Sequence, residues 1–229
     1  MADHQLALKR AAAQAAVELV EDGIRLGLGT GTTSALFIEL LGERVRTGLR
    51  VTAIATSIHS HERAAALGIP LVDSLQEPLD LAVDGADEID PQLNLLKGRG
   101  GALVREKLVA VAAHRFVVIA DEGKLVERLG AGVVPVEVLP FLWQQTAHRL
   151  ETLAPLTWTL RGAGGDAPFV SDNGNLVLDL LLPDGVADPV AFGAQLKSVT
   201  GVVEHGIFAG LARACLVAGP DGVRVMGDL

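Results

Sequence analysis

The sequence predicts an α/β fold in two parts: a mostly parallel sheet with helices on both faces, and a smaller α+β domain. Up to about residue 129, short apolar runs alternate with stretches of helical spacing, an order typical of a Rossmann-like parallel sheet. Beyond it the order becomes β-α-β-β-α-β, which is typical of a ferredoxin-like domain. We therefore expect one domain from residues 1–129 and 206–229, and a second from residues 130–205.

The elements of the first domain follow from apolar spacing and from residues that begin or end helices. Asp3 is expected to cap a first helix that runs to about Val20 with its apolar side chains on one face. Three more helices are expected to end near Leu41, Leu67 and Ala113. Strands are expected at 24–28, 51–55, 79–83 and 115–120, and the segments 214–218 and 223–226 should return to this sheet.

The second domain contains a hairpin and a well-marked helix start. Asn173-Gly174 is a strong hairpin signal, so we expect a tight turn there. Asp188-Pro189 should begin a helix, because aspartate favours the cap and proline the first helical position. The remaining elements are strands at 134–139, 156–161, 176–182 and 202–207 and helices at 141–153 and 188–199.

Composition restricts the possible partners of this 229-residue chain. A formal net charge of −9 argues against nucleic acid as a partner. Neither a signal peptide nor an uncharged apolar run of about 18 residues is visible, so no membrane partner is expected. The single cysteine, Cys215, lies in an apolar run and is expected to be a buried thiol in a reducing cytoplasm.

A glycine-rich turn follows the first expected strand and leads into a helix. Helix N-termini favour anions, because bare N–H groups and the helix dipole meet there. The turn is not a P-loop, and Ser34 stands where a dinucleotide fingerprint needs its third glycine. We favour a phosphate site over a plain tight turn because of the residues that line it: Gly27, Gly29, Gly31, Thr30, Thr32, Thr33 and Ser34.

A second stretch, residues 82–107, concentrates charged side chains and glycines. Asp84 and Asp87 directly follow an apolar run and should lie at the carboxyl end of a strand, where ligands bind in open α/β sheets. Lys97 and a glycine loop come next, and Glu106 lies in the first turns of a helix. Each residue alone is compatible with a turn or a surface charge, but the set predicts a binding site.

The chemistry that these residues support is proton transfer without a metal or cofactor. His59 and His61 are two apart and point to different sides of their helix, so they are not expected to bind metal. A carboxylate can remove a proton next to a carbonyl when a cation stabilises the oxyanion that forms. Glu106 is the candidate base and Lys97 the candidate cation. Lys124 follows another strand end, where a pocket position and a helix-start charge are equally compatible.

The chain closely resembles ribose-5-phosphate isomerase, type A, nearly from end to end. The combination of VDGADE with KGxGGA and REK is very specific. The matching motifs are GLGTGTT (27–33), VDGADEID (83–90), LKGRGGALVREK (96–107), IADEGK (119–124), VPVEV (134–138), SDNGN (171–175) and GVVEHGIFA (201–209).

This resemblance implies reversible conversion of D-ribose 5-phosphate to D-ribulose 5-phosphate, in the non-oxidative pentose phosphate pathway. Glu106 would move a proton between C2 and C1 through an enediolate. The partner would be a small sugar phosphate, and no cofactor or metal would be needed. The resemblance also implies a cytoplasmic homodimer or homotetramer, with the domain of residues 130–205 serving oligomerisation.

The resemblance also assigns site residues by position. Asp84 would open the sugar ring and bind hydroxyls, while Asp87 and Lys97 would orient the chain and stabilise the enediolate. Relatives often have glycines after the lysine, whereas Arg99 interrupts them here and is expected to point outward. The residues implied in substrate binding are Lys9, Thr30, Gly31, Thr32, Thr33, Asp84, Gly85, Ala86, Asp87, Lys97, Gly98, Arg99, Gly100 and Lys124.

Two alternatives share some of these features. A sugar-phosphate deaminase or CoA-transferase-like enzyme would also have a glycine turn after an early strand, but would lack the paired acids followed by Lys97 and Glu106. A sugar-phosphate-binding regulator would need a DNA-binding module, and no segment is left over to form one.

Overall fold

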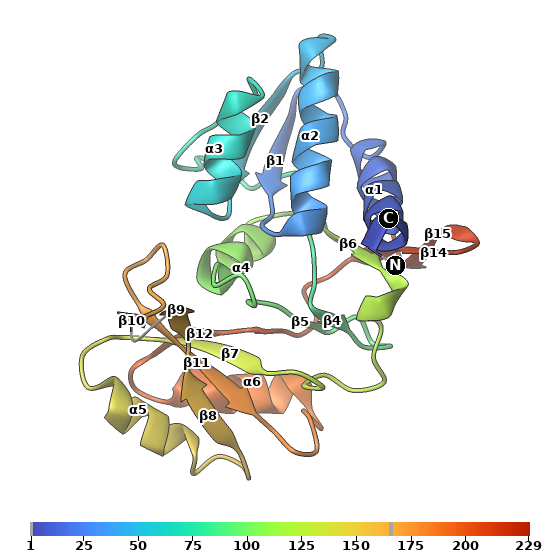
Figure 1. Ribbon diagram of the computed structural model, residues 1–229. Coiled ribbons are helices and arrows are strands. Elements are labelled where there is room, and N and C mark those ends of the chain that lie inside the picture. Colours follow the sequence, from blue (N-terminus) through green and yellow to red (C-terminus); the bar gives the residue numbers. More distant parts are fainter. Residues whose placement is uncertain (1, 165–166) are drawn as a thin grey trace. The chain divides into compact units, whose positions relative to one another are not determined.

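The computed structural model describes residues 2–164 and 167–229 of the chain (Figure 1). The chain divides into two compact units, each built from separate segments of sequence. The first unit comprises Met1–Ala86, Arg105–Lys124 and Leu211–Leu229, and the second comprises Asp87–Val104 and Leu125–Gly210. Residues 87–104, which the sequence analysis placed with the first sheet, thus make their contacts in the second unit.

The first unit contains a six-stranded sheet in the order β15-β14-β6-β3-β1-β2. Every neighbouring pair is parallel except β14 and β15, which form an antiparallel edge; that both segments return to this sheet is as predicted. The strands are β1 (Ile24–Leu28), β2 (Val51–Ala55), β3 (Leu81–Asp84), β6 (Phe116–Asp121), β14 (Ala214–Gly219) and β15 (Gly222–Gly227). The helices are α1 (Ala2–Val17), α2 (Thr32–Arg46), α3 (Ile58–Ala66), α4 (Leu103–Val111) and the 3-10 turn η1 (Glu122–Lys124).

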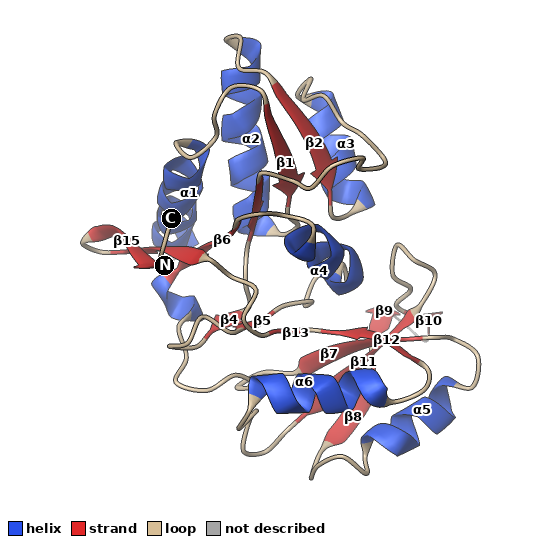
Figure 2. Cartoon of the chain, turned by 180° about the vertical axis from the view of Figure 1, so that it is seen from behind, coloured by secondary structure: helices blue, strands red, loops and turns tan. Residues whose placement is uncertain are grey.

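Helices cover both faces of this sheet, which confirms the predicted architecture. Leu26 and Leu28 are fully buried in one core with residues of α1 and α2. Figures 1 and 2 show α2 and α3 together on one side of β1 and β2. Gly27 faces the opposite way, and a Cβ there would come within 2.4 Å of Val109 Cγ1 on α4. A glycine in β1 therefore lets α4 pack closely against the second face.

The second unit contains a four-stranded antiparallel sheet in the order β12-β7-β11-β8. Along the chain these are the fourth, first, third and second strands, the arrangement of a ferredoxin-like domain. Val136, Val138, Leu178 and Leu180 face a shared core with the two helices. The elements are β7 (Val134–Val138), α5 (Trp143–Leu150), β8 (Thr157–Leu160), β11 (Leu176–Leu181), α6 (Pro189–Ser198) and β12 (Val202–His205).

Several short elements of the second unit escaped prediction. A three-stranded sheet consists of β4 (Glu88–Ile89), β5 (Leu95–Leu96) and β13 (Ile207–Phe208). A two-stranded antiparallel sheet consists of β9 (Gly162–Gly164) and β10 (Ala167–Pro168). Two-residue strands are too short to show the alternation that marks a strand. The Asn173-Gly174 turn is confirmed: Gly174 has φ +78° and its N–H donates to Ser171 O at 2.9 Å.

Three details of the first unit differ from expectation. Asp3 lies within the first turn of α1 rather than capping it, so that prediction was wrong. β3 begins at Leu81, because Leu79 forms only an isolated bridge with Ala113. α2 continues to Arg46, five residues beyond Leu41, where Arg44 and Arg46 suit the negative end of the helix dipole.

Cys215 is buried in β14, as predicted. Burial raises the pKa of its thiol to about 12, so at neutral pH it is an unreactive hydrophobic group rather than a nucleophile. Within the part of the chain that the structure describes, no helix is both long enough and apolar enough to cross a bilayer.

Candidate active site

The turn between β1 and α2 presents an uncapped helix N-terminus. Gly31 is the N-cap residue of α2, with φ +112°, and as a glycine it has no side chain to cap the helix. Residues other than glycine rarely adopt that backbone conformation, so glycine is needed at this position. The N–H groups of the first turn are therefore not covered by a capping side chain, which suits an anion.

Asp84, at the end of β3, holds this turn in place. Its Oδ1 accepts hydrogen bonds from the Thr30 N–H at 3.0 Å, the Ser34 hydroxyl at 3.0 Å and the Gly85 N–H at 2.7 Å. Gly29 lies directly against it, since a Cβ there would be 2.0 Å from Asp84 Oδ1. The two motifs that the sequence marked separately are thus one hydrogen-bonded structure in the first unit.

The hydroxyl of Thr30 belongs to a cluster of hydroxyl groups at the ends of β1 and β2. Thr30 Oγ1 lies 2.7 Å from Thr56 Oγ1, 2.8 Å from Ser57 Oγ and 3.2 Å from Ser60 Oγ. Ser60 also donates to the carbonyl of Gly29 at 2.8 Å. The sequence predicts that the Thr30 and Ser34 hydroxyls donate to a ligand, but in the structure both bond to protein groups that shape the turn.

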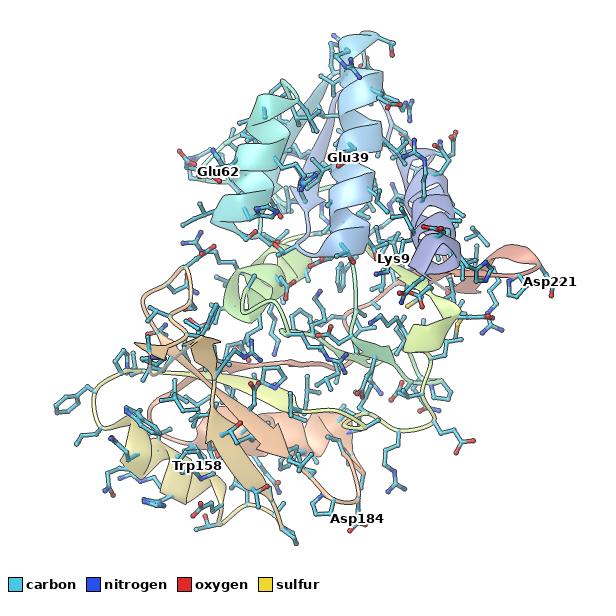
Figure 3. All side chains as sticks on the ribbon, viewed as in Figure 1. Lys9, Glu39, Glu62, Trp158, Asp184 and Asp221 are labelled. Atoms are coloured by element: carbon cyan, nitrogen blue, oxygen red, sulfur yellow. The ribbon has the colours of Figure 1, made fainter. Side chains whose placement is uncertain are left out.

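Lys9 brings a positive charge to the start of α2. It projects from α1 (Figure 3), and its Nζ donates to Thr32 Oγ1 at 2.9 Å. Lys9 is half-buried, whereas the neighbouring Arg10 is exposed, as the sequence analysis expected for a surface residue. A lysine beside an uncapped helix N-terminus and the Thr32 and Thr33 hydroxyls is a suitable environment for a phosphate group.

Glu106 lies on α4 in a buried position, with 6% of its surface exposed. The end of α4 meets the start of the sheet, because the Leu79 N–H donates to Ala112 O at 2.8 Å. Val109 packs over Gly27 in the middle of β1. Glu106 is one helical turn earlier on the same face, about 5 Å further toward the carboxyl edge of the sheet. This is the edge at which Asp84 ends β3.

Lys124 also follows a strand at that edge. It ends η1, directly after β6, and β6 pairs with β3 so that Asp84 lies opposite Val118. Lys124 is half-buried. It is thus both a residue of a short helical turn and a cation at the ligand-binding edge of a parallel sheet.

Ala86 ends the first segment of the first unit, and the other predicted residues lie in the second unit: Asp87, Lys97, Gly98, Arg99 and Gly100. Lys97 follows β5 and is only 2% exposed; its N–H donates to Gly206 O at 2.8 Å, and its Nζ lies 5.6 Å from the centre of the Phe208 ring. Gly98 has φ +105° and begins a turn in which the Gly101 N–H donates to Gly98 O at 3.0 Å. The backbone of residues 97–101 is therefore held in one defined conformation.

Arg99 joins this loop to the acidic motif. Its N–H donates to Asp87 Oδ2 at 3.0 Å, and its guanidinium lies 3.9 Å from Asp87 Oδ1 and 3.8 Å from Glu88 Oε1. The side chain is 51% exposed, so it lies at the surface, as expected, but beside two carboxylates. Arg99 therefore offsets negative charge next to Asp87.

Two supporting groups were missed by the sequence analysis. Glu88 is buried and accepts the N–H groups of Gly130 at 2.7 Å and Gly132 at 2.8 Å, which fixes the segment before β7. Arg161 donates to backbone carbonyls of the 97–101 loop. Both contacts join residues more than 40 positions apart, and only a correct prediction of strand pairing could have revealed them.

Among the described residues, no three His, Cys, Asp or Glu side chains gather as metal ligands. The groups that are present are carboxylates, lysines, hydroxyls and uncapped N–H groups. Such groups can bind a phosphorylated hydroxy compound and move protons on it.

Comparisons with known proteins agree with this chemistry. Residues 52–222 match the family model of ribose 5-phosphate isomerase A (phosphoriboisomerase A). Ribose-5-phosphate isomerase A of Nitrobacter hamburgensis is 48% identical over 231 residues, covering 96% of this chain and 97% of the relative. The similarity therefore extends through both units.

Solved structures are similar over the same length. A ribose 5-phosphate isomerase from Plasmodium falciparum matches with a TM-score of 0.93 and 37% identity, over 97% of this chain and 99% of its own. A D-ribose-5-phosphate isomerase in complex with phospho-erythronic acid matches with a TM-score of 0.91 and 38% identity, over 96% of this chain and 98% of its own.

Proposed function

Because the chain belongs to the ribose 5-phosphate isomerase A family and is a ribose-5-phosphate isomerase of the pentose phosphate pathway, we propose that Glu106 performs its proton transfer. The observation that carries this proposal is a buried carboxylate on α4, one helical turn from Val109 toward the sheet edge where Asp84 ends β3. A partly desolvated carboxylate is a suitable general base.

The proposed reaction keeps atoms and charge in balance. The Glu106 carboxylate takes the proton from C2 of the open-chain aldose, and the electron pair of the C2–H bond forms the C1–C2 double bond of an enediolate. The negative charge moves to the former aldehyde oxygen. Glu106 then returns the proton to C1, and the C2 hydroxyl becomes the ketone as its proton passes to the negatively charged C1 oxygen. This second transfer completes the ketose and leaves Glu106 as a carboxylate.

The remaining roles follow from the chemistry of each group. The Lys97 ammonium stabilises the enediolate oxygen, Asp87 orients the sugar hydroxyls, and Asp84 assists ring opening. Stabilisation of such an oxyanion by a fixed donor typically accounts for about 10²–10³ in rate. Gly85, Ala86 and the backbone of residues 98–100 complete the sugar site in this proposal.

The phosphate group is proposed to bind at the start of α2. The supporting observations are the uncapped helix N-terminus at Gly31, the Thr32 hydroxyl and the neighbouring Lys9. Lys124 supplies a second cation from the end of β6. The relative solved with phospho-erythronic acid suggests the same class of ligand for this chain, a phosphorylated hydroxy acid that resembles the enediolate.

Three further properties are part of the proposal. We infer a homodimer or homotetramer in which the second unit forms the contacts between subunits. We also infer a cytoplasmic location, supported by a single buried cysteine. No cofactor is required by the proton transfer described above. The deaminase-like, CoA-transferase-like and regulator alternatives are set aside by the family assignment.

The test replaces the proposed base with its neutral amide. Glu106→Gln is expected to fold normally and to lose at least ~10² in kcat, because the amide cannot accept the proton. Ribulose 5-phosphate formation from ribose 5-phosphate is measured with EDTA present. Glu62→Gln, an exposed glutamate on α3 (Figure 3), is the matched control and should keep full activity. Near-normal turnover by Glu106→Gln would refute the assignment.

A further inference from the structure

Arg161 is a half-buried cation whose role the reaction scheme leaves open. It lies between β8 and β9 in the second unit, with 13% of its side chain exposed. Its Nε donates to Asp179 Oδ2 at 2.9 Å, and a second nitrogen donates to Asp179 Oδ1. This two-pronged pairing with a carboxylate on β11 fixes the plane of the guanidinium.

The third nitrogen of this guanidinium binds the backbone of the 97–101 loop. Arg161 NH1 donates to Gly98 O at 2.8 Å and to Arg99 O at 3.2 Å. Two successive carbonyls therefore point to the same side of the loop, toward Arg161. A single charged group thus sets the orientation of the two peptides that follow Lys97.

Peptide geometry determines where the matching N–H groups point. In a trans peptide the N–H is directed opposite to the C=O of the preceding residue. The Arg99 N–H, paired with Gly98 O, accordingly points away from Arg161 and reaches Asp87 Oδ2 at 3.0 Å. The Gly100 N–H, paired with Arg99 O, must also point to the side away from Arg161. Gly100 is exposed, and its N–H has no acceptor among the described residues.

Aromatic packing supports the same arrangement. The Phe169 ring lies 5.8 Å from the Arg161 guanidinium carbon and also contacts Gly101, where a Cβ would be 2.3 Å from its Cζ. The Phe169 N–H donates to Arg161 O at 2.8 Å. Arg161, Asp179 and Phe169 thus form one support beneath the loop, which we call the loop clamp.

We propose that Arg161 is a positioning residue of the isomerase reaction: held by Asp179, it orients the peptides after Lys97 so that the Gly100 N–H donates to an oxygen of the sugar chain. This role rests on the proposed function, in which residues 97–100 contact the substrate. Arg161 itself touches no substrate and acts through the backbone. Displacing such a loop by about 1 Å can reduce the rate by ~10².

The experiment compares variants of Arg161 with those of a similar arginine elsewhere. Arg25 in the first unit also donates from two guanidinium nitrogens to one carboxylate, that of Asp80. It supports no part of the proposed site. Arg161→Lys, Arg161→Ala, Arg25→Lys and Arg25→Ala are assayed for kcat, KM, thermal midpoint and inhibition by inorganic phosphate. The Arg161→Ala and Arg25→Ala enzymes are assayed again with added guanidinium ion at a few millimolar.

We expect both Arg161 variants to lose about tenfold or more in kcat, with KM and phosphate inhibition changed less than about twofold. Guanidinium ion should restore part of the kcat of Arg161→Ala. The Arg25 variants should lower the thermal midpoint comparably while keeping kcat. Wild-type kcat in folded Arg161 variants would overturn the proposal, and so would a loss matched by Arg25 that guanidinium does not restore.

The proposed function is tested separately. If Glu106→Gln loses its turnover while the Arg161 variants keep theirs, only the role of Arg161 is refuted. If Glu106→Gln remains active, the proposed base is wrong whatever the Arg161 variants do.

Discussion

Two glycine-containing segments, residues 29–34 and 97–101, are both assigned to the substrate, yet they are stabilised in different ways. The first is fixed by polar groups at the ends of neighbouring strands of the first unit: Asp84 accepts hydrogen bonds from two groups of the turn and from its own next residue, and Thr30 lies among hydroxyls. The second is fixed by Asp87, 12 positions away, and by groups from a later segment of the second unit, namely Arg161, Phe169 and Gly206.

This difference explains why one segment could be interpreted from the sequence and the other only in part. A glycine turn between a strand and a helix carries its own structural signal. The 97–101 loop has recognisable residues, but its conformation depends on partners that no local pattern indicates. The comparison can be tested by substitutions in both segments.

The largest expected effect comes from filling the space at a glycine of each segment. Gly29→Ala would place a methyl group 2.6 Å from the Asp84 Cα, which is backbone and cannot move aside. We expect a loss of about 3 kcal/mol in the free energy of unfolding. In Gly101→Ala the added methyl group meets the Phe169 side chain, which can move. The positive φ of residue 101, +79°, should lower the free energy of unfolding by about 1–2 kcal/mol, apart from any cost of repacking Phe169, and we expect the total loss to be smaller than for Gly29→Ala.

Urea unfolding of both variants, alone and with Phe169→Leu, measures this contrast. The smaller side chain at 169 should relieve part of the Gly101→Ala loss and none of the Gly29→Ala loss. If Phe169→Leu reduced the stability loss of both glycine variants equally, the two segments would be supported in the same way.

A smaller effect distinguishes the inward from the outward hydroxyls of the first turn. Thr30→Val leaves buried hydroxyls without a partner and should cost about 1–3 kcal/mol of stability. Thr32→Val lies at the surface beside Lys9, so its stability should stay within about 0.5 kcal/mol while KM rises about tenfold. Thermal unfolding and steady-state kinetics on the pair decide; a KM effect confined to Thr30→Val would reverse the assignment.

The smallest effect concerns Lys124, which is proposed to bind the phosphate group from the end of β6. Lys124→Ala should raise KM by about tenfold and leave kcat within about twofold, because it removes one charge-assisted bond to phosphate. Raised salt should reduce the difference from wild type. An unchanged KM would return Lys124 to the role of a surface charge and leave Lys9 as the cation of the turn.

The architecture could be predicted from the sequence wherever a helix or strand was long enough to show its periodic spacing of apolar residues. β1 and β2 have the predicted bounds, and the sheet of β7, β8, β11 and β12 follows from the β-α-β-β-α-β order. The two-residue strands beside Lys97 could not be predicted, because two residues are too few to show the alternation that marks a strand.

The residues of the candidate site could be predicted from the sequence, but the contacts between them could not. Asp84 and the glycine turn were both marked, yet nothing local indicated that one accepts hydrogen bonds from the other. Arg161, between β8 and β9, and Asp179, on β11, are 18 positions apart, and either could have been a surface charge. Side-chain direction and strand register determine these contacts, and neither can be obtained from composition or spacing.

The four crossings between the units affect how the chain is completed during synthesis on the ribosome. Both segments of the second unit have been made once residue 210 emerges, whereas the first sheet still lacks β14 and β15. The first unit, whose synthesis begins first, is therefore the last to be completed. Until then the open edge of β6 is a strand without its neighbour, the kind of surface on which a growing chain is most prone to aggregate.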